Sequence, residues 1–424
     1  MKIAIIGLGY VGLPLACAID LKTSHEVVGY DYQSKKVNKI RNRQCPIDDV
    51  QCSEDLKITK FLVSDQADIM TDSDIFIICV PTPVLNDYTP DLTPLKSGVE
   101  AVLPYIKKGC YVVVESTINP GVCDEIVIPM IEDSIDLKAG IDFDVAHCPE
   151  RINPGDPFWN VYNIPRNIGS TRPEATKVLA DFYRSFISGE INEMPNLKTV
   201  EATKIIENTF RDINIAFVNE LAKSFDVLNI DLMAVIKGAS NKPFAFLPHF
   251  PGCGVGGHCI PVDPYYLIER ARQSGFDHKL LKLAREINNS MPEYTVEKLT
   301  DALNILERPI KNTPIALLGL SYKANVGDLR ESPSVILKSI LHEKQAATFV
   351  YDPYFPEHSN VDSLEMALEN SYAVVLATDH NLFKEKLTPE FLLKYNIRIV
   401  IDGKNCLDKE NIIKAGILYK GIGT

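Results

Sequence analysis

Short apolar runs, each closed by glycine or polar residues, alternate with helix-compatible segments along the first third of the chain. The run KIAII at 2–6 leads into G7-L-G9-Y-V-G12 and an apolar helical segment, and a second run, EVVGYD, ends at Asp31. Continuous apolar runs of this length, without alternating polar positions, indicate strands that are buried on both faces of a parallel sheet. Further strands are predicted at 74–83, 111–121 and 143–151.

The middle of the chain is predicted to be helical. Residues 199–225 contain no Gly or Pro, and their apolar side chains recur at spacings of three and four residues, which predicts one long helix. More helix is expected to about 239, and again over 264–274 and 279–290. The apolar stripe of the long helix suggests self-association, and it comprises Ala202, Ile205, Ile206, Thr209, Ile213, Ala216 and Phe217.

The last third of the chain repeats the first. The segment IALLGLSYK at 315–323 matches IAIIGLGYV at 3–11 position by position, and strand-like runs follow at 347–353, 372–380 and 397–405. Strands that alternate with helices in this way are typical of parallel α/β sheets. The chain is therefore predicted to form two Rossmann-like doubly wound parallel-sheet domains, at 1–196 and 309–424, joined by a central all-helical domain at 197–308.

The second copy differs from the first in its turn. Ser321 replaces the second glycine and Ala324 stands where the third would be, so a pyrophosphate could not approach as closely there. Lys323, Arg330 and Lys404 offer cations at the carboxyl edge of this sheet, where they suit a phosphate or a carboxylate. We therefore expect the second copy to keep the fold and to bind a different ligand.

Composition narrows the class of protein. With 46% apolar and 24% charged residues among 424, the chain reads as a soluble globular protein of several domains. A formal net charge of −12 disfavours partners such as nucleic acid or an anionic membrane. The ten cysteines include no C-x-x-C pair or zinc spacing, so we expect no metal and a reducing, cytoplasmic compartment. Glycines interrupt the apolar run of Met1–Ala18, which argues against a signal peptide, and no stretch has membrane-spanning character.

The first glycine-rich turn predicts a dinucleotide site. In such a turn Gly7 makes the tight bend, Gly9 lets a pyrophosphate approach and Gly12 lets the helix pack on the strand. The position between two strands, with an acid at the expected distance, makes this motif specific. Asp31 would bind the adenosine ribose hydroxyls and favours NAD over NADP, although lysines 35–36 lie close enough to weaken that preference.

A second glycine-rich stretch, PGCGVGGHCIPVD at 251–263, presents one thiol, Cys259, and a carboxylate, Asp263. A thiol on such a loop beside an acid is typical of a covalent nucleophile, and the alternative is a packed cysteine. On the long helix, Lys204 and Asn208 stand at i and i+4 and project from one face, as functional side chains or as an ordinary solvated pair.

Polar residues also follow the predicted strands of the first sheet. Thr82, Thr117 and Glu150 stand at the carboxyl ends of three of them. Ligands bind at that edge of open α/β sheets, so these residues are candidates for contact with cofactor or substrate. The alternative is that they are ordinary turn residues.

These motifs together resemble the UDP-sugar 6-dehydrogenases of the UDP-glucose and UDP-mannuronate dehydrogenase superfamily. The resemblance covers nearly the whole chain and is carried by GLGYVG, VPTP, VVVESTINPG, CPERINPGD, KIIEN, GVGGHCIPVDPYYL and GLSYKANVGDLRESP. PDLTPL at 90–95, PERINPGD at 149–156 and FLPHFPG look most like the branch acting on UDP-N-acetylglucosamine and UDP-N-acetylgalactosamine for capsule and O-antigen synthesis. Relatives acting on UDP-N-acetylmannosamine share GVGGHCIPVDP, so the epimer stays open.

The resemblance implies a four-electron oxidation of C6, from primary alcohol to carboxylate, with two NAD⁺. An aldehyde has no second hydride to give until a nucleophile adds to its carbonyl. Cys259 would therefore capture it as a thiohemiacetal, which is oxidised to a thioester that water hydrolyses. By the same resemblance Lys204 would stabilise the oxyanion, Asn208 would position substrate and water, Asp263 and Thr117 would order that water, and Glu150 would be the acid at the edge of the active site.

The resemblance also assigns binding residues and a partner. In the family the central helical segment forms a dimer, so the resemblance implies a homodimer. The expected NAD residues are Gly7, Gly9, Tyr10, Val11, Gly12, Asp31, Lys36, Val80, Pro81, Thr82, Thr117 and Arg330. The expected UDP-sugar residues are Glu150, Arg151, Lys204, Asn208, Phe250, Gly254, Gly256, Tyr322, Lys323 and Lys404.

Four positions depart from the family pattern or stay open. Pro154 stands where the UDP-glucose branch has a second glutamate, and Lys404 stands where that branch has arginine, which loses bidentate contact with phosphate. Phe250 replaces an arginine of several relatives, so another cation or a neighbouring subunit would have to compensate. For His258 we favour packing or cofactor contact over tuning of the thiol.

Other functions stay open at this point. Within the superfamily the substrate can be UDP-N-acetylmannosamine or UDP-glucose. A two-electron hydroxyacid dehydrogenase of the 6-phosphogluconate type has a similar layout but needs no thiol. A nucleotide-sugar or NAD sensor that has lost its chemistry is a non-enzymatic alternative, disfavoured because thiol, lysine and acid are all present.

Overall fold

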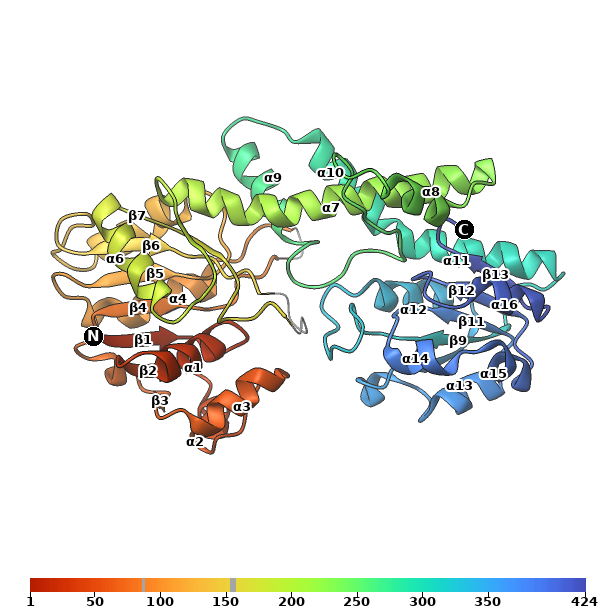
Figure 1. The fold of residues 1–424 in the computed structure, drawn as a ribbon, viewed down its shortest axis with the longest axis horizontal. Coiled ribbons are helices and arrows are strands. Elements are labelled where there is room, and N and C mark those ends of the chain that lie inside the picture. The colour runs from red at the N-terminus through yellow and green to blue at the C-terminus, as the bar shows by residue number, and fades with distance from the viewer. Residues whose placement is uncertain (86–87, 153–157) are drawn as a thin grey trace. The chain divides into compact units, whose positions relative to one another are not determined.

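The strands predicted at the two ends of the chain form two parallel sheets, one in each of two compact units. The structure is a computed structural model and describes residues 1–85, 88–152 and 158–424. The first unit comprises Met1–Glu207 with Tyr265–Phe276, and the second comprises Asn208–Pro264 with Asp277–Thr424 (Figure 1). The predicted α/β class with two Rossmann-like sheets and a helical middle is confirmed. The three-domain boundaries stay a prediction.

The sheet of the first unit has the strand order β3-β2-β1-β4-β5-β6-β7-β8. All neighbours are parallel except β6 and β7, which run antiparallel and pair at His147 and Gly169. The sequence pattern had not indicated β3, β7 or β8. The strands are β1 (Lys2–Ile6), β2 (Glu26–Tyr30), β3 (Leu62–Ser64), β4 (Ile75–Ile78), β5 (Tyr111–Val114), β6 (Asp144–His147), β7 (Arg166–Ser170) and β8 (Ile191–Glu193).

Helices cover both faces of this sheet, so its apolar strands are buried on both sides. Ile3 and Ile5 face one helical layer, whereas Ala4 and Ile6 face the other. The first layer contains α1 (Gly12–Lys22), α2 (Ser34–Arg41), α3 (Val50–Ile58) and α6 (Pro173–Arg184). The second contains α4 (Thr93–Val102), α5 (Ile128–Glu132), the 3₁₀ turns η1 (Ala67–Met70) and η2 (Leu103–Tyr105), and the π-helical turn η3 (Cys123–Val127).

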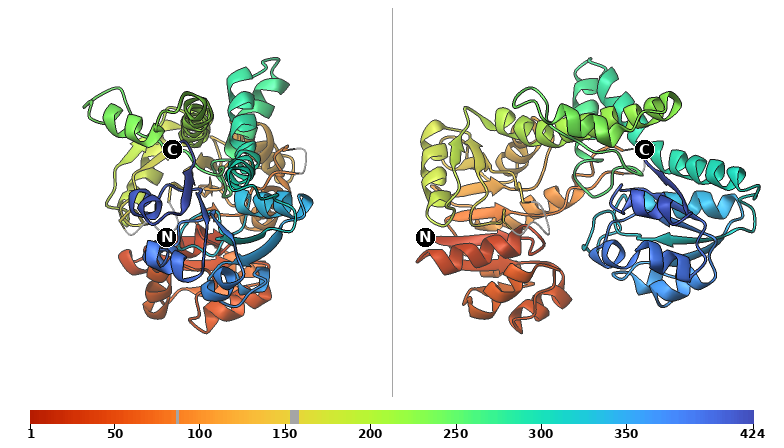
Figure 2. Two further views of the ribbon diagram at one scale, coloured as in Figure 1. Left: turned by 90° about the vertical axis from the view of Figure 1, so that its right-hand side faces the viewer. Right: turned by 45° about the vertical axis from the view of Figure 1, so that its right-hand side comes forward.

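The second unit contains a five-stranded parallel sheet in the order β10-β9-β11-β12-β13. Helices lie on both of its faces, as Figure 2 also shows. Its strands are β9 (Pro314–Leu318), β10 (Ala347–Tyr351), β11 (Ala373–Leu376), β12 (Ile399–Asp402) and β13 (Leu418–Gly421). One face is covered by α11 (Met291–Ile305) and α12 (Pro333–Glu343). The other face is covered by α13 (Leu364–Glu369), α14 (Asn381–Lys386), α15 (Pro389–Lys394) and α16 (Lys409–Lys414), and the turn η4 (Pro356–His358) follows β10.

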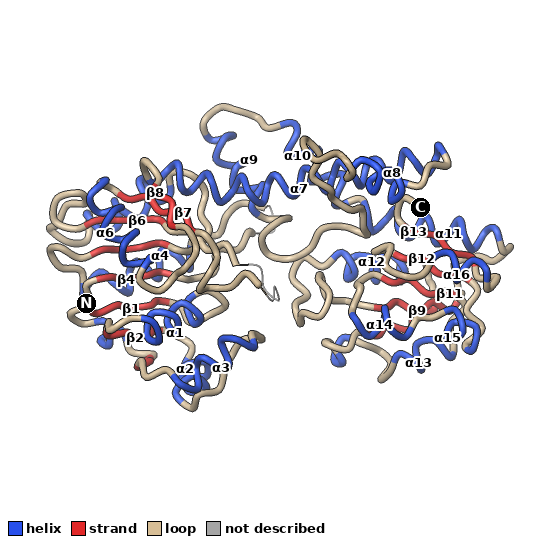
Figure 3. The backbone as a smooth tube through the Cα atoms, viewed as in Figure 1, coloured by secondary structure: helices blue, strands red, loops and turns tan. Residues whose placement is uncertain are grey.

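The predicted long helix is confirmed as α7 (Leu197–Leu228), visible as an extended helix in Figure 3. Its apolar stripe divides, because Ile205 and Ala216 are buried whereas Ile206 and Phe217 are 57% and 54% exposed. The other predicted helices are α8 (Leu232–Ala239), α9 (Asp263–Gln273) and α10 (Lys279–Asn289). Among the described residues, every helix is too short or too polar to cross a membrane.

Candidate active site

The turn after β1 has the geometry that a dinucleotide requires. Gly7 has φ 90°, and a Cβ there would lie 2.7 Å from the carbonyl oxygen of Cys79, so glycine is needed for both conformation and space. A Cβ on Gly9 would meet no atom within 4 Å, which leaves room beside the start of α1 at Gly12. The predicted pyrophosphate position is therefore open in the first unit, and these residues fit NAD.

Asp31 lies at the end of β2 and is only 3% exposed. Its carboxylate accepts hydrogen bonds from the amides of Leu8 and Gln33, each at 3.0 Å, and from Lys36 Nζ at 2.7 Å. A carboxylate offers about four lone-pair sites, so these donors leave capacity for a ribose hydroxyl. Lys36 is thus the counter-ion of Asp31. Tyr10 is 40% exposed beside this turn, and Val11 precedes α1.

The loops after β4 and β5 are tied together. Thr82 Oγ1 donates to the carbonyl of Thr117 at 2.6 Å, and Ser116 Oγ donates to the carbonyl of Val80 at 2.7 Å. The hydroxyl of Tyr266 donates to the carbonyl of Thr82. The structure therefore brings Thr82 and Thr117 together at the sheet edge where the sequence placed them, with Pro81 in the loop that joins Val80 to Thr82.

Glu150 is held by a buried arginine that sequence reasoning missed. Arg166 donates to Glu150 at 2.6 Å through Nη2 and to Glu115 at 3.0 Å through Nη1. The other oxygen of Glu150 accepts the amides of Arg151 and Ile152. Burial raises the pKa of Glu115, and the charge of Arg166 acts in the opposite direction. No motif marks Arg166, because its partners come from distant strands. Pro154 lies outside the described residues.

Arg151 and Lys204 differ in how they are engaged within the first unit. Arg151 pairs with Glu207 on α7 at 2.7 Å and donates to the carbonyl of Pro165. Lys204, also on α7, is 9% exposed. Glu201, one turn earlier, accepts two backbone amides of the segment after β5, which anchors this end of α7 to the sheet. Both assignments to the substrate stay predictions.

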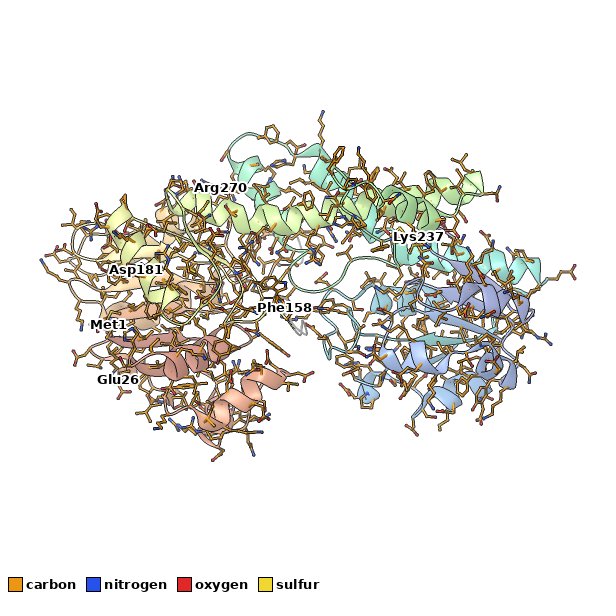
Figure 4. All side chains as sticks on the ribbon, in the orientation of Figure 1. Met1, Glu26, Phe158, Asp181, Lys237 and Arg270 are labelled. Atoms are coloured by element: carbon orange, nitrogen blue, oxygen red, sulfur yellow. The ribbon has the colours of Figure 1, made fainter. Side chains whose placement is uncertain are left out.

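Helix α9 contributes a half-buried arginine that anchors it to the same unit. The side chain of Arg270, labelled in Figure 4, pairs with Glu125 of η3. Tyr265, the residue after Pro264, stacks on Tyr88 with ring centroids 4.2 Å apart. The segment Tyr265–Phe276 is thereby fixed to the first unit.

In the second unit the structure brings Asn208 and Asp263 together. Asn208 Nδ2 donates to Asp263 Oδ2 at 2.6 Å, and both side chains are buried. Cys259 is half-buried, and its carbonyl accepts the amide of Asp263 at 2.8 Å. A thiol that is reachable and lies on the turn before an acid fits a nucleophile, whereas Cys253 on the same loop is fully buried and donates to the carbonyl of Ala377.

The glycine-rich loop packs against the carboxyl edge of the second sheet. A Cβ on Gly256 would lie 2.6 Å from Tyr322 Cβ, and one on Gly254 would lie 2.7 Å from Pro333 Cβ. The amide of Gly252 is held by Asn219 Oδ1 at 3.0 Å. The glycines therefore let the loop approach Tyr322, which the sequence had assigned to the sugar nucleotide.

Two of the predicted cations of the second unit, Arg330 and Lys404, lie close to the glycine-rich loop. Arg330 makes an ion pair with Asp328 at 2.6 Å, and its carbonyl accepts the amide of Gly257. Burial opposes ionisation of Asp328, and the hydrogen bonds from Arg330 outweigh it and lower the pKa of Asp328. Lys404 follows β12, and a Cβ on Gly252 would lie 4.0 Å from its Nζ. Phe250 precedes the glycine-rich loop and His258 lies within it, and both side chains are exposed. Lys323 follows Tyr322 and is half-buried.

Three models of the UDP-glucose/GDP-mannose dehydrogenase family match the chain in order. The NAD binding domain matches residues 1–187, the central domain matches residues 198–290, and the UDP binding domain matches residues 316–409. The chain belongs to the UDP-glucose/GDP-mannose dehydrogenase family. This dehydrogenase is an NAD-dependent oxidoreductase that acts on CH–OH groups of UDP-sugars, which confirms the predicted family, enzyme class and cofactor.

Named relatives of this dehydrogenase differ in the sugar. It is 36% identical to the UDP-N-acetyl-D-mannosamine dehydrogenase of Pyrococcus horikoshii, over 100% of this chain and 99% of the relative. It is 34% identical to the UDP-N-acetyl-D-glucosamine 6-dehydrogenase of Pseudomonas aeruginosa, over 91% of this chain and 92% of the relative. The relatives therefore fix the reaction family and leave the hexosamine open.

Solved structures agree with the fold of the dehydrogenase. The UDP-D-ManNAc dehydrogenase of Pyrococcus horikoshii has a TM-score of 0.92 with 36% identity, covering 100% of this chain and 99% of that one. The NDP-N-acetyl-D-galactosaminuronic acid dehydrogenase of Methanosarcina mazei Go1 has a TM-score of 0.86 with 30% identity, covering 100% and 95%. The roles of individual site residues stay predictions.

Proposed function

We propose that this protein oxidises C6 of a UDP-N-acetylhexosamine from primary alcohol to carboxylate. The observation that carries the proposal is the half-buried thiol of Cys259 on a loop whose following acid, Asp263, is hydrogen-bonded to Asn208. A two-electron hydroxyacid dehydrogenase would have no use for such a thiol. A sensor would have no reason to keep thiol, acid and amide in this arrangement.

In the proposed reaction the chain supplies the nucleophile and the charges around it. NAD⁺, when bound, accepts a hydride in each of the two oxidations. In the first oxidation the C6 hydroxyl loses its hydride to NAD⁺ and its proton to the ordered water. The thiolate of Cys259 then adds to the aldehyde carbonyl, and the thiohemiacetal oxyanion loses the second hydride to give a thioester. Water adds to the thioester carbonyl and the C–S bond breaks, which releases the carboxylate, both protons of that water to solvent, and the thiolate. Lys204 stabilises the negative charge on the C6 oxygen, and Asn208 with Asp263 orders the water.

The supporting observations favour different hexosamines. The motifs at 90–95 and 149–156 favour UDP-N-acetylglucosamine or UDP-N-acetylgalactosamine. The 36% identity over the full chain to a relative named for UDP-N-acetyl-D-mannosamine favours that epimer as the second candidate. All three sugars share the C6 alcohol, so the proposed chemistry is the same for each.

The test is turnover of the purified protein with UDP-N-acetylglucosamine, UDP-N-acetylgalactosamine, UDP-N-acetylmannosamine and UDP-glucose, each followed by NADH absorbance. We expect two NADH per sugar with one hexosamine, loss of turnover in Cys259→Ser, and normal turnover in Cys406→Ser, a matched half-buried thiol of the same unit. One NADH per sugar with an active Cys259→Ala protein would support the two-electron alternative. No turnover with any sugar would defeat the proposal.

We also propose that the protein is a homodimer formed through α7. Phe210, Phe217 and Leu228 lie seven and eleven residues apart, so they share one helix face, and each is 48–60% exposed. Exposed aromatic and aliphatic side chains along one face favour burial against a partner. Light scattering should give a dimer, and Phe217→Glu should shift it towards monomer. The ten cysteines show neither C-x-x-C pairs nor zinc spacing, a pattern that supports the proposal of a reducing, cytoplasmic compartment.

A further inference from the structure

Two polar groups of the first unit, a fully buried ring nitrogen and the ammonium of a largely buried lysine, each lack the partner that the other could supply. The ammonium of Lys204, on a side chain that is 9% exposed, makes no hydrogen bond or ion pair within residues 1–85, 88–152 and 158–424. His147 is fully buried, and its Nε2 has no hydrogen-bond partner among the same residues. A buried polar atom without a partner is costly, so His147 Nε2 calls for an explanation, and Lys204 is the cation with donors to spare.

The protonation state of His147 follows from its other nitrogen. Nδ1 lies 2.8 Å from the carbonyl oxygen of Val114. A carbonyl only accepts hydrogen bonds, so Nδ1 carries the proton and Nε2 presents a lone pair. Burial, with a smaller contribution from the charge of Lys204, lowers the pKa of His147 to about 3, so the ring is neutral at neutral pH. Nε2 is therefore an acceptor.

Sheet and helix geometry places the two groups on the same side of the unit. His147 ends β6, pairing with Val114 on β5 and with Gly169 on β7. A Cβ on Gly169 would lie 3.2 Å from Val200 Cγ1, so α7 passes directly over this part of β7. Val200 and Lys204 stand at i and i+4 and share a helix face. The acceptor and the cation thus belong to one packed region, at the carboxyl end of β6.

We propose that His147 is a positioning residue for the oxidation: its Nε2 lone pair takes a hydrogen bond from the Lys204 ammonium when substrate is bound. The bond fixes one N–H of the ammonium and thereby directs another N–H to the C6 oxygen. A neutral acceptor suits this task, because a carboxylate would neutralise the charge that stabilises the oxyanion. The inference rests on the proposed function, from which the role of Lys204 is taken.

Two substitutions separate the functions of the two ring nitrogens. His147→Asn keeps a donor near Nδ1 for the carbonyl of Val114 and removes the Nε2 acceptor. His147→Gln keeps an acceptor near Nε2. We expect His147→Asn to lower kcat roughly 10- to 100-fold, the loss of one hydrogen bond to a charged group, with the KM for UDP-sugar nearly unchanged. His147→Gln should retain most of the activity.

A double mutant tests whether His147 acts through the lysine. In a Lys204→Met background, His147→Asn should cause no further loss of the residual rate, because coupled residues are non-additive. Full kcat in His147→Asn, or equal losses in the Asn and Gln variants, would overturn the inference and indicate a structural histidine or one bonded to a buried water.

A spectroscopic readout keeps the inference separate from the proposed function. With saturating UDP-N-acetylglucosamine present, the ¹⁵N resonance of His147 Nε2, assigned by its absence in His147→Asn, should shift towards that of a free lone pair in Lys204→Met. Inactivity of the wild-type protein on every UDP-sugar would defeat the proposed function alone. An Nε2 resonance that Lys204→Met leaves unchanged in the presence of the nucleotide sugar would defeat the hydrogen bond itself, whether or not the sugar is turned over.

Discussion

The two sheets of this protein have the same backbone turn after their first strand, but the side chains around that turn differ. Gly7 and Gly319 both follow the first strand of their sheet, with φ 90° and 91°. The amide of Gly7 donates to the carbonyl of Tyr30 at 2.8 Å, and that of Gly319 donates to Tyr351 at 2.9 Å. The backbone of the turn is therefore shared, and what separates the two sheets is the side chains around it.

The acid that follows the second strand is engaged differently in the two units. Asp31 accepts three hydrogen bonds within the described residues, which leaves one of about four lone-pair sites. Asp352 accepts five, which exceeds that number. The donors to Asp352 are Leu320 N at 2.6 Å, Ser321 N at 2.9 Å, Ser321 Oγ at 3.1 Å, His380 Nε2 at 3.2 Å and Tyr354 N at 2.7 Å.

The comparison teaches that a missing glycine is only part of the reason why a repeated sheet changes its ligand. Ser321 stands at the position of Gly9, where a Cβ meets nothing within 4 Å, and its hydroxyl also donates to Asp352, the counterpart of the acid predicted to bind the ribose. His380 consumes the same acid from another strand's end. The carboxylate of the second copy is thus structural, whereas Asp31 of the first copy keeps its predicted role in binding NAD, and residues 316–409 of the second copy match a UDP binding domain.

The largest expected effect is on stability, in Asp352→Asn. An amide in place of the carboxylate turns one acceptor into a donor that faces N–H groups, so we expect the free energy of unfolding of the second unit to fall by about 3 kcal/mol. Denaturant unfolding followed by far-UV circular dichroism measures this. The matched variant Asp31→Asn should lose less stability and should instead raise the KM for NAD⁺. Equal stability losses in the two variants would break the comparison.

The next effect is the pH dependence of the same acid. Burial opposes ionisation of Asp352, but the hydrogen bonds from His380, Ser321 and Leu320 outweigh it and lower its pKa to about 2. A folded pKa below the unfolded value of about 3.9 gives about 2 to 3 kcal/mol of stability that is present above that value and is lost as the pH falls towards 2. Acid unfolding curves of wild type and Asp352→Asn should converge in this window, and parallel curves would contradict the assignment.

Much of this contrast could be predicted from the sequence, and part of it could not. The apolar runs around Gly7 and Gly319 are local signals, as is the replacement of a glycine by Ser321. The partnership of Asp352 with His380 joins strands that are distant in sequence, and no local pattern encodes it. Arg166 was missed for the same reason, since β7 is a polar strand and Arg166 pairs with two carboxylates, Glu115 and Glu150, that follow other strands of the sheet.

A smaller effect is expected at the open position of the first turn. Because a Cβ on Gly9 meets nothing within 4 Å, Gly9→Val should fold normally and place its methyl groups where the pyrophosphate approaches. We expect the KM for NAD⁺ to rise roughly tenfold, about 1.4 kcal/mol, with the KM for UDP-sugar unchanged. The matched control is Gly238→Val on α8, where a Cβ also meets nothing within 4 Å. A normal KM for NAD⁺ in Gly9→Val would place the cofactor elsewhere.

The smallest effect, and the sharpest for the comparison, is that of Ser321→Gly, which restores the glycine of the first copy. Loss of the hydroxyl bond to Asp352 should cost about 1 kcal/mol, read as a small fall in the thermal midpoint. Calorimetry should still find one NAD⁺ per chain, because His380 and three backbone amides continue to occupy the acid. A second equivalent of NAD⁺ would mean that the missing glycine alone keeps the second sheet from binding the cofactor. Binding that appears only when His380→Ala is added would mean that the saturated acid is the stronger barrier.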